Sequence, residues 1–206
     1  MFDRHLQKLT QKPLSFFAKI ILKYLSANQI TIIGFVFGMV MCFFIYFESF
    51  LLAICFLILN RFCDGLDGVM ARLTAPTNLG AYLDIVFDFI FYSAFILIFG
   101  LQDTNNIVIS SFLLFSYICT GTTFLAQAII QPKLDLARRE ESLDSDIPKG
   151  FYYSAGLIEG TETIIFMILC LLFPNLYFFF GLIFTILCLS TALSRIIIFS
   201  KRNKYY

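Results

Sequence analysis

Four aspartates lie close together in a stretch of sequence that is otherwise mostly apolar. Asp64 and Asp67 are three residues apart, and Asp84 and Asp88 are four apart, so each pair shares one face of a helix. Only the short segment 73–79 separates the pairs. The two helices must therefore pack antiparallel, and both acidic pairs lie near the same end. Four carboxylates in one cleft repel each other unless a cation neutralises them.

A set of ligands made only of oxygen is the kind that hard divalent ions prefer. We therefore predict that Asp64, Asp67, Asp84 and Asp88 hold two divalent metal ions, Mg²⁺ or Mn²⁺. A pair of such ions can clamp the attacking and the leaving oxygen of a phosphoryl displacement. The acidic cluster thus favours chemistry on a phosphate-containing substrate.

The composition places this cluster in a membrane. Charged residues make up 14% of the 206 residues and hydrophobic residues 59%, whereas soluble domains carry about 25% charged residues. The chain cannot cover itself with polar groups, so lipid must be much of its surroundings. The net charge of +1 gives no argument for a nucleic-acid partner, and we expect none.

The apolar stretches predict an all-α integral membrane protein, with residues 1–206 as one domain. A spanning helix needs about 20 mostly apolar residues, and six stretches meet this: 29–48, 50–72, 80–101, 107–130, 152–173 and 176–199. Residues 5–25 interleave apolar residues with lysines, which predicts an amphipathic helix lying in the membrane interface. The six-span bundle therefore covers 29–199.

The distribution of lysine and arginine predicts the orientation. These residues gather near the N-terminus, in the linker 131–151 and at the C-terminus. Because cytoplasmic loops carry the excess of positive charge, both termini and the acidic cluster are expected on the cytoplasmic side. The linker 131–151 is expected to be a cytoplasmic loop with some helix.

The acidic and small residues of the second and third spans form one continuous pattern. It reads Asp64-x-x-Asp67-Gly68-x-x-Ala71-Arg72, seven residues, then Gly80-x-x-x-Asp84-x-x-x-Asp88. The pattern resembles the signature of the CDP-alcohol phosphotransferase (CDP-alcohol phosphatidyltransferase) family. Six spans and an amphipathic N-terminal helix also match that family, as does the stretch Asn28-Gln29-Ile30-Thr31 at the start of the first span.

The resemblance implies an enzyme of phospholipid biosynthesis. Such an enzyme takes its substituted phosphate group from a CDP-linked lipid donor, expected to be CDP-diacylglycerol, passes it to a hydroxyl acceptor, and releases CMP. By the same resemblance, the four aspartates bind the metals and Asp88 is also the general base. Gly68 and Ala71 would let cytidine lie close to the helix, Arg72 would steady the donor phosphates, and Gly80 would keep the mouth of the site open. A homodimer in a bacterial inner (cytoplasmic) membrane is implied as well.

The acceptor is not fixed by the sequence. Glu159 and Glu162 either line an acceptor pocket or pair with a buried arginine, Arg61 or Arg195. Thr31 either touches the nucleotide or belongs to the N-terminal cap of the first span.

Asn60 is expected to support the metal site by contacting the residues that bind the ions, without binding an ion itself.

An alternative function is also open. The protein could be a divalent-cation transporter that uses the same aspartates, because carboxylates inside a membrane often mark ion paths.

Overall fold

The computed structural model describes residues 13–141, residue 158 and residues 160–202, with the backbone alone for 132–141 and 202. All regular structure within these residues is helical, which confirms the all-α prediction for this part of the chain. Residues 13–21 are helical. They are followed by α2 (Ala27–Tyr46), α3 (Phe50–Leu73), α4 (Asn78–Gln102), η1 (Thr104–Asn106), α5 (Ile107–Glu141), α6 (Gly160–Leu172), η2 (Pro174–Leu176) and α7 (Tyr177–Arg202).

Four segments are long and apolar enough to cross a membrane by length and composition: Ala27–Tyr46, Asn78–Gln102, Thr104–Gln131 and Pro174–Lys201. Helix α3 has 24 residues, but its charged side chains lower its hydropathy. The described part of α6 has 13 residues. Six spans therefore remain a prediction, with four supported by the helices themselves.

Helices α2 and α4 begin at other residues than the predicted spans, because capping side chains fix their first turns. Ser26 forms a capping box with Gln29 and starts α2 at Ala27, because both side chains bind backbone N–H groups that the first turn leaves unpaired. Thr77 accepts a hydrogen bond from the Gly80 N–H at 3.0 Å and starts α4 at Asn78. Helix α5 continues to Glu141, so the first half of the predicted loop 131–151 is helix.

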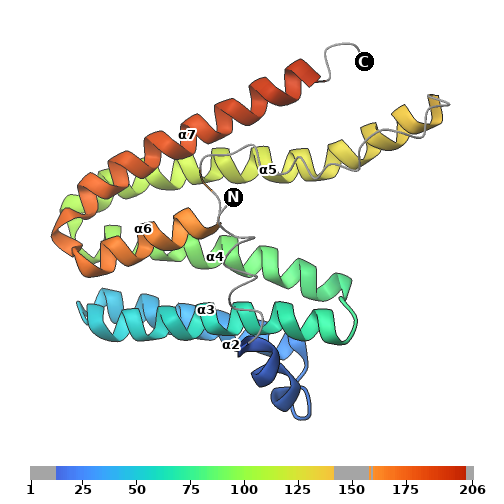
Figure 1. The fold of residues 1–206 in the computed structure, drawn as a ribbon. Helices are drawn as coiled ribbons and strands as arrows, with labels where there is room; N and C mark the ends of the chain where they lie inside the picture. The colour runs from blue at the N-terminus through green and yellow to red at the C-terminus, as the bar shows by residue number, and fades with distance from the viewer. Residues whose placement is uncertain (1–12, 142–157, 159, 203–206) are drawn as a thin grey trace.

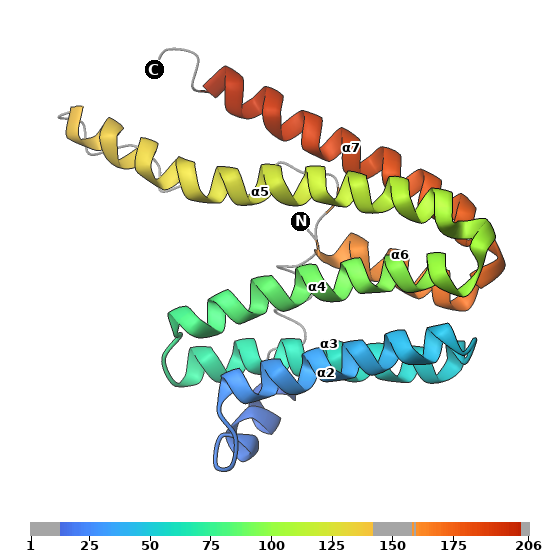
Figure 2. The ribbon, with the colours of Figure 1, turned by 180° about the vertical axis from the view of Figure 1, so that it is seen from behind.

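The long helices run back and forth, and their connections fall at two ends of the molecule (Figure 1). Helix α2 packs against α3 and α4, while α5 packs against α4 and α7. At one end α3 turns into α4. We call this the α3–α4 end, and the other the opposite end. Helices α5 and α7 diverge from α2 and α3 toward the α3–α4 end in both views (Figure 2).

The N-terminal helical turn packs across the α3–α4 end. Ala18 is fully buried, and it belongs to a cluster with Leu66 and Met70 of α3. Phe16 and Ile20 are exposed on the outer side. The segment 13–21 thus has one buried and one exposed apolar side, as an interfacial helix would, and residues 5–12 of the predicted helix lie outside the described residues.

Candidate active site

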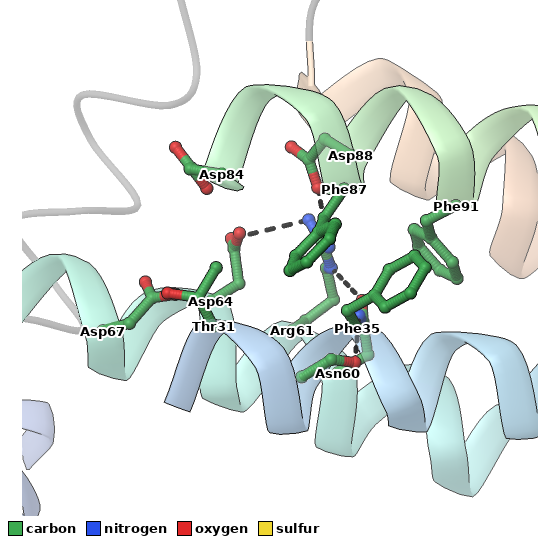
Figure 3. Close-up of a pocket in the computed structure, with 11 residues that line it drawn as sticks. Thr31, Phe35, Asn60, Arg61, Asp64, Asp67, Asp84, Phe87, Asp88 and Phe91 are labelled. Atoms are coloured by element: carbon green, nitrogen blue, oxygen red, sulfur yellow. Dashed lines mark hydrogen bonds and ion pairs between the residues drawn. The ribbon is translucent and has the colours of Figure 1, made fainter. Parts of the chain in front are cut away.

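Three carboxylates from two helices meet near the α3–α4 end. Asp64 of α3 and Asp84 and Asp88 of α4 each offer an oxygen atom, and these three atoms lie within 4.8 Å of one another. The short turn at 74–77 makes α3 and α4 antiparallel, so the acidic face of each helix is turned toward the other (Figure 3). The donor set is entirely oxygen, which suits a hard divalent ion.

Asp67 lies in the same pocket but outside this group of three. It is buried, with 8% of its surface exposed, and lines the pocket together with Thr31 of α2. The structure therefore brings three of the four predicted metal ligands together and places the fourth beside them, one turn nearer the end of α3. Thr31 contributes to the pocket and also bonds back to the Ala27 carbonyl at 3.1 Å.

The pocket is lined by residues of α2, α3 and α4, and the space between their atoms, with the adjoining open solvent included, is about 290 Å³. Its lining residues are Thr31, Gly34, Phe35, Asn60, Arg61, Asp64, Asp67, Asp84, Phe87, Asp88 and Phe91. Among these described residues, Arg61 carries the one positive charge. A pocket with four carboxylates and one guanidinium has a strongly negative interior, which favours cations.

Arg61 contacts two of the three clustered carboxylates. Its Nη2 lies 3.2 Å from Asp88 Oδ1, and its Nη1 lies 3.5 Å from Asp64 Oδ2. The guanidinium also sits over the rings of Phe91 and Tyr92, 5.5 and 5.8 Å from their centroids. Within the described residues, the acidic partners of Arg61 are therefore aspartates of the site and not Glu162, while the predicted alternative, Glu159, lies outside these residues.

Asn60 holds Arg61 in place. The Arg61 Nε donates to Asn60 Oδ1 at 2.7 Å, and Asn60 Nδ2 donates to the Gly34 carbonyl at 2.8 Å. Asn60 is buried, so this pair of bonds satisfies its amide. Asn60 was predicted to support the metal site, and in the structure the side chain that it supports is Arg61.

Glycines on α2 allow the three helices to approach each other at the pocket. A Cβ added at Gly34 would lie 2.9 Å from the Cβ of Cys63 on α3, and one added at Gly38 would lie 2.6 Å from the Phe91 ring on α4. Small residues spaced four apart let membrane helices pack closely. Gly34 and Gly38 therefore bring α2 within reach of both acidic helices.

Four of the predicted substrate-binding residues lie outside this pocket lining. Gly68, Ala71 and Arg72 continue along α3 toward its end, and a Cβ added at Gly68 would meet only the Arg72 guanidinium, at 3.5 Å. A Cβ at Gly80 would lie 2.7 Å from Asn28 Oδ1, so Gly80 permits contact between the starts of α4 and α2. Glu159 lies outside the described residues.

Several aromatic residues that the sequence pattern did not single out lie in the pocket or next to it. Phe35 and Phe87 stack with ring centroids 4.3 Å apart, and the Tyr92 hydroxyl donates to Asp88 Oδ2 at 3.3 Å. Tyr92 follows Asp88 by four residues and Phe35 follows Thr31 by four. The helical spacing was thus a signal for both, although such spacing is equally common in packed cores.

The family model for CDP-alcohol phosphatidyltransferase matches residues 24–196. The chain is also similar to the inner membrane protein YnjF of Escherichia coli (strain K12), with 36% identity over 200 residues, which is 95% of this chain and 94% of that protein. The predicted resemblance is confirmed, because the model covers most of the chain including all four aspartates: the chain belongs to the CDP-alcohol phosphatidyltransferase family.

Proposed function

We propose that this protein transfers a phosphatidyl group from CDP-diacylglycerol to a hydroxyl acceptor and releases CMP. Family membership implies phosphatidyl transfer in lipid synthesis. The observation that carries the proposal is the meeting of Asp64, Asp84 and Asp88 within 4.8 Å at an open pocket. Carboxylates in this number are costly near a membrane interior, and a metal-dependent reaction gives a reason for them.

Asp64, Asp84 and Asp88 would hold divalent ions, Mg²⁺ or Mn²⁺, and Asp67 would complete a site for two of them. When bound, such ions would neutralise the charge of the donor pyrophosphate and of the departing CMP. The three-carboxylate cluster fits an ion because its ligand atoms are oxygens from two rigid helices. Asp67 lines the same pocket as these three carboxylates.

Asp88 is the proposed general base. The acceptor oxygen forms a bond to the β-phosphorus of the donor, and the bond from that phosphorus to the oxygen bridging the two phosphates breaks. The electron pair of the broken bond stays on CMP, and the acceptor's proton moves to the Asp88 carboxylate. No oxidant or further reactant is needed.

The last turns of α3 are proposed to bind the nucleotide. The open surface at Gly68 and Ala71 would accept the cytidine, and Arg72 would pair with donor phosphate oxygens. Helices α2 and α4 are apolar outside the pocket, with exposed Ile32 and Ile85, so the acyl chains of the donor could remain in the membrane. We place this site, with both termini, on the cytoplasmic side of a bacterial inner membrane.

One reconstitution experiment tests the function. Purified protein in phosphatidylcholine vesicles is supplied with Mn²⁺ or Mg²⁺, CDP-diacylglycerol and a panel of alcohols that includes serine, inositol and glycerol 3-phosphate. We expect metal-dependent CMP release with at least one acceptor. Passage of Mn²⁺ into sealed vesicles without CMP release would favour the alternative, a cation transporter. The homodimer implied by the resemblance can be measured by light scattering on the purified protein in detergent, before it is placed in vesicles.

A further inference from the structure

Both oxygens of the Asp88 carboxylate are bound by neighbouring side chains. Arg61 Nη2 donates to Oδ1 at 3.2 Å from α3, and the Tyr92 hydroxyl donates to Oδ2 at 3.3 Å from the next turn of α4. Two bonds to different oxygens oppose rotation of the carboxylate about its last torsion, which is otherwise broad. Each oxygen has two lone pairs, so each keeps one for an acceptor proton or an ion.

Hydrogen bonds to other neighbours also hold the Arg61 side chain in place. Its Nε is bound by Asn60, which is anchored to the Gly34 carbonyl of α2. Its Nη1 also donates to the Tyr92 hydroxyl at 3.3 Å. A continuous set of hydrogen bonds therefore runs from the α2 backbone through Asn60 and Arg61 to Asp88 (Figure 3). Tyr92 joins the set through its bonds to both Arg61 and Asp88.

These contacts require an arginine. A guanidinium carries five N–H donors in a planar fork and stays charged at all working pH values. Arg61 uses separate nitrogens for Asn60, Asp88 and Tyr92. A lysine has one nitrogen on a flexible stem and cannot reach these partners together.

We propose that Arg61 and Tyr92 are positioning residues that fix the Asp88 carboxylate in the orientation from which it takes the acceptor's proton. In this role both residues act through Asp88. The inference rests on the proposed function, because it assigns these two side chains to the same transfer reaction. It adds a support for the base that lies outside the aspartate and glycine signature.

The test separates turnover from metal binding. In Arg61→Lys we expect kcat to fall about 100-fold, the size of effect that misplacing a reacting group produces, while KM for CDP-diacylglycerol stays near the wild-type value. Mn²⁺ affinity, measured without substrate by electron paramagnetic resonance, is expected to be no weaker than in the wild type. The metal ligands remain in this variant, and the lysine ammonium competes with Mn²⁺ for their carboxylates less strongly than the arginine guanidinium does.

A second buried tyrosine, Tyr177, provides a matched control for a substitution at Tyr92. Tyr92→Phe removes one hydrogen bond to Asp88 and is expected to lower kcat about tenfold, the equivalent of one hydrogen bond to a charged group. Tyr177 also has a buried hydroxyl with partners, Ser110 and the Ile96 carbonyl, but it lies at the opposite end. Tyr177→Phe is expected to leave kcat and Mn²⁺ affinity unchanged.

A fourth variant keeps the test valid if the substitutions disturb folding. Arg61→Ala leaves a space that a free guanidinium ion can fill, so guanidinium chloride at low concentration is expected to restore part of the lost kcat, whereas sodium chloride of equal ionic strength is not. Unchanged kcat in Arg61→Lys would overturn the inference alone, and so would Mn²⁺ affinity that falls in parallel with kcat. A wild-type protein that releases no CMP with any acceptor would instead remove the proposed function together with this inference.

Discussion

The two ends of helix α4 are built from different kinds of contact. At the α3–α4 end its side chains meet charged partners, as in the Arg61–Asp88 pair at 3.2 Å. At the opposite end they meet aromatic rings, as in Phe99, which is fully buried and stacks on Tyr177 with centroids 4.4 Å apart and planes 2° from parallel. Another stacked pair, Phe166 and Phe184, belongs to the same apolar cluster.

The difference shows a division of work along one helix bundle. Stacked aromatic rings stabilise the bundle through dispersion contacts and buried apolar surface, and they bury no charge. The opposite end can therefore hold the helices together. Carboxylates at the α3–α4 end repel one another and contribute to stability only through Arg61, Tyr92 or a bound ion. The packing at the site thus comes from the apolar contacts around it, such as the cluster with Ala18, Leu66 and Met70, and not from the carboxylates themselves.

The largest expected effect comes from changing the same group at the two ends of α4. Asp88→Asn removes the proposed base and is expected to lower CMP release about 1,000-fold, within the range for general-base removal. Asp103→Asn makes the same chemical change at the opposite end, where the Asp103 Oδ1 accepts from the Asn105 N–H at 2.9 Å. An asparagine oxygen can keep that bond, so we expect normal CMP release. Equal activity in the two variants would contradict the division.

A large effect on stability is expected at the aromatic end. Phe99→Ala removes a stacked, fully buried ring and should cost about 3 kcal/mol, equivalent to a Tm lower by roughly 6–12 °C in a chain of this size. Mn²⁺ affinity measured well below the Tm is expected to be unchanged. Phe112→Ala, at a ring that is 60% exposed, serves as the control and should leave the Tm nearly unchanged. Loss of Mn²⁺ binding in Phe99→Ala would show that the two ends are not separable.

A smaller effect is expected from two glycines one turn apart on α3. Gly68→Ala meets only the flexible Arg72 guanidinium, so the protein should fold, while the added methyl group blocks the nucleotide. We expect KM for CDP-diacylglycerol to rise about tenfold with kcat unchanged, the pattern of a lost binding contact. Gly65→Ala meets Leu14 of the N-terminal segment and is expected to leave KM near the wild-type value. If KM rose in Gly65→Ala and not in Gly68→Ala, the nucleotide would instead bind at the face of α3 that carries Gly65.

The sequence predicted the parts of this site that depend on spacing. Two acidic pairs on two short-linked helices had to face each other, and Asp64, Asp84 and Asp88 do so. It did not predict the partners of Arg61, because its choice among acidic side chains depends on how α2, α3 and α4 pack in three dimensions. Nor did it predict the full length of α5, whose end at Glu141 is a polar stretch rich in the helix formers Leu, Ala, Arg and Glu.

The role of Tyr92 shows the same limit. A tyrosine four residues after an aspartate on a helix is more often a packing residue than a partner of the carboxylate. Only the fold shows that its hydroxyl reaches Asp88 while its ring forms part of the core. Gly80 is similar, since its contact with Asn28 joins two helix starts that are far apart in the sequence.

The central claim is that α3 and α4 together hold divalent ions between their acidic faces. Diffraction from crystals grown with Mn²⁺, recorded at a wavelength where manganese scatters anomalously, tests it without any assay. We expect anomalous density in contact with carboxylate oxygens of Asp64, Asp84 and Asp88. Anomalous density located elsewhere, or its absence at a Mn²⁺ concentration that supports CMP release, would contradict the account.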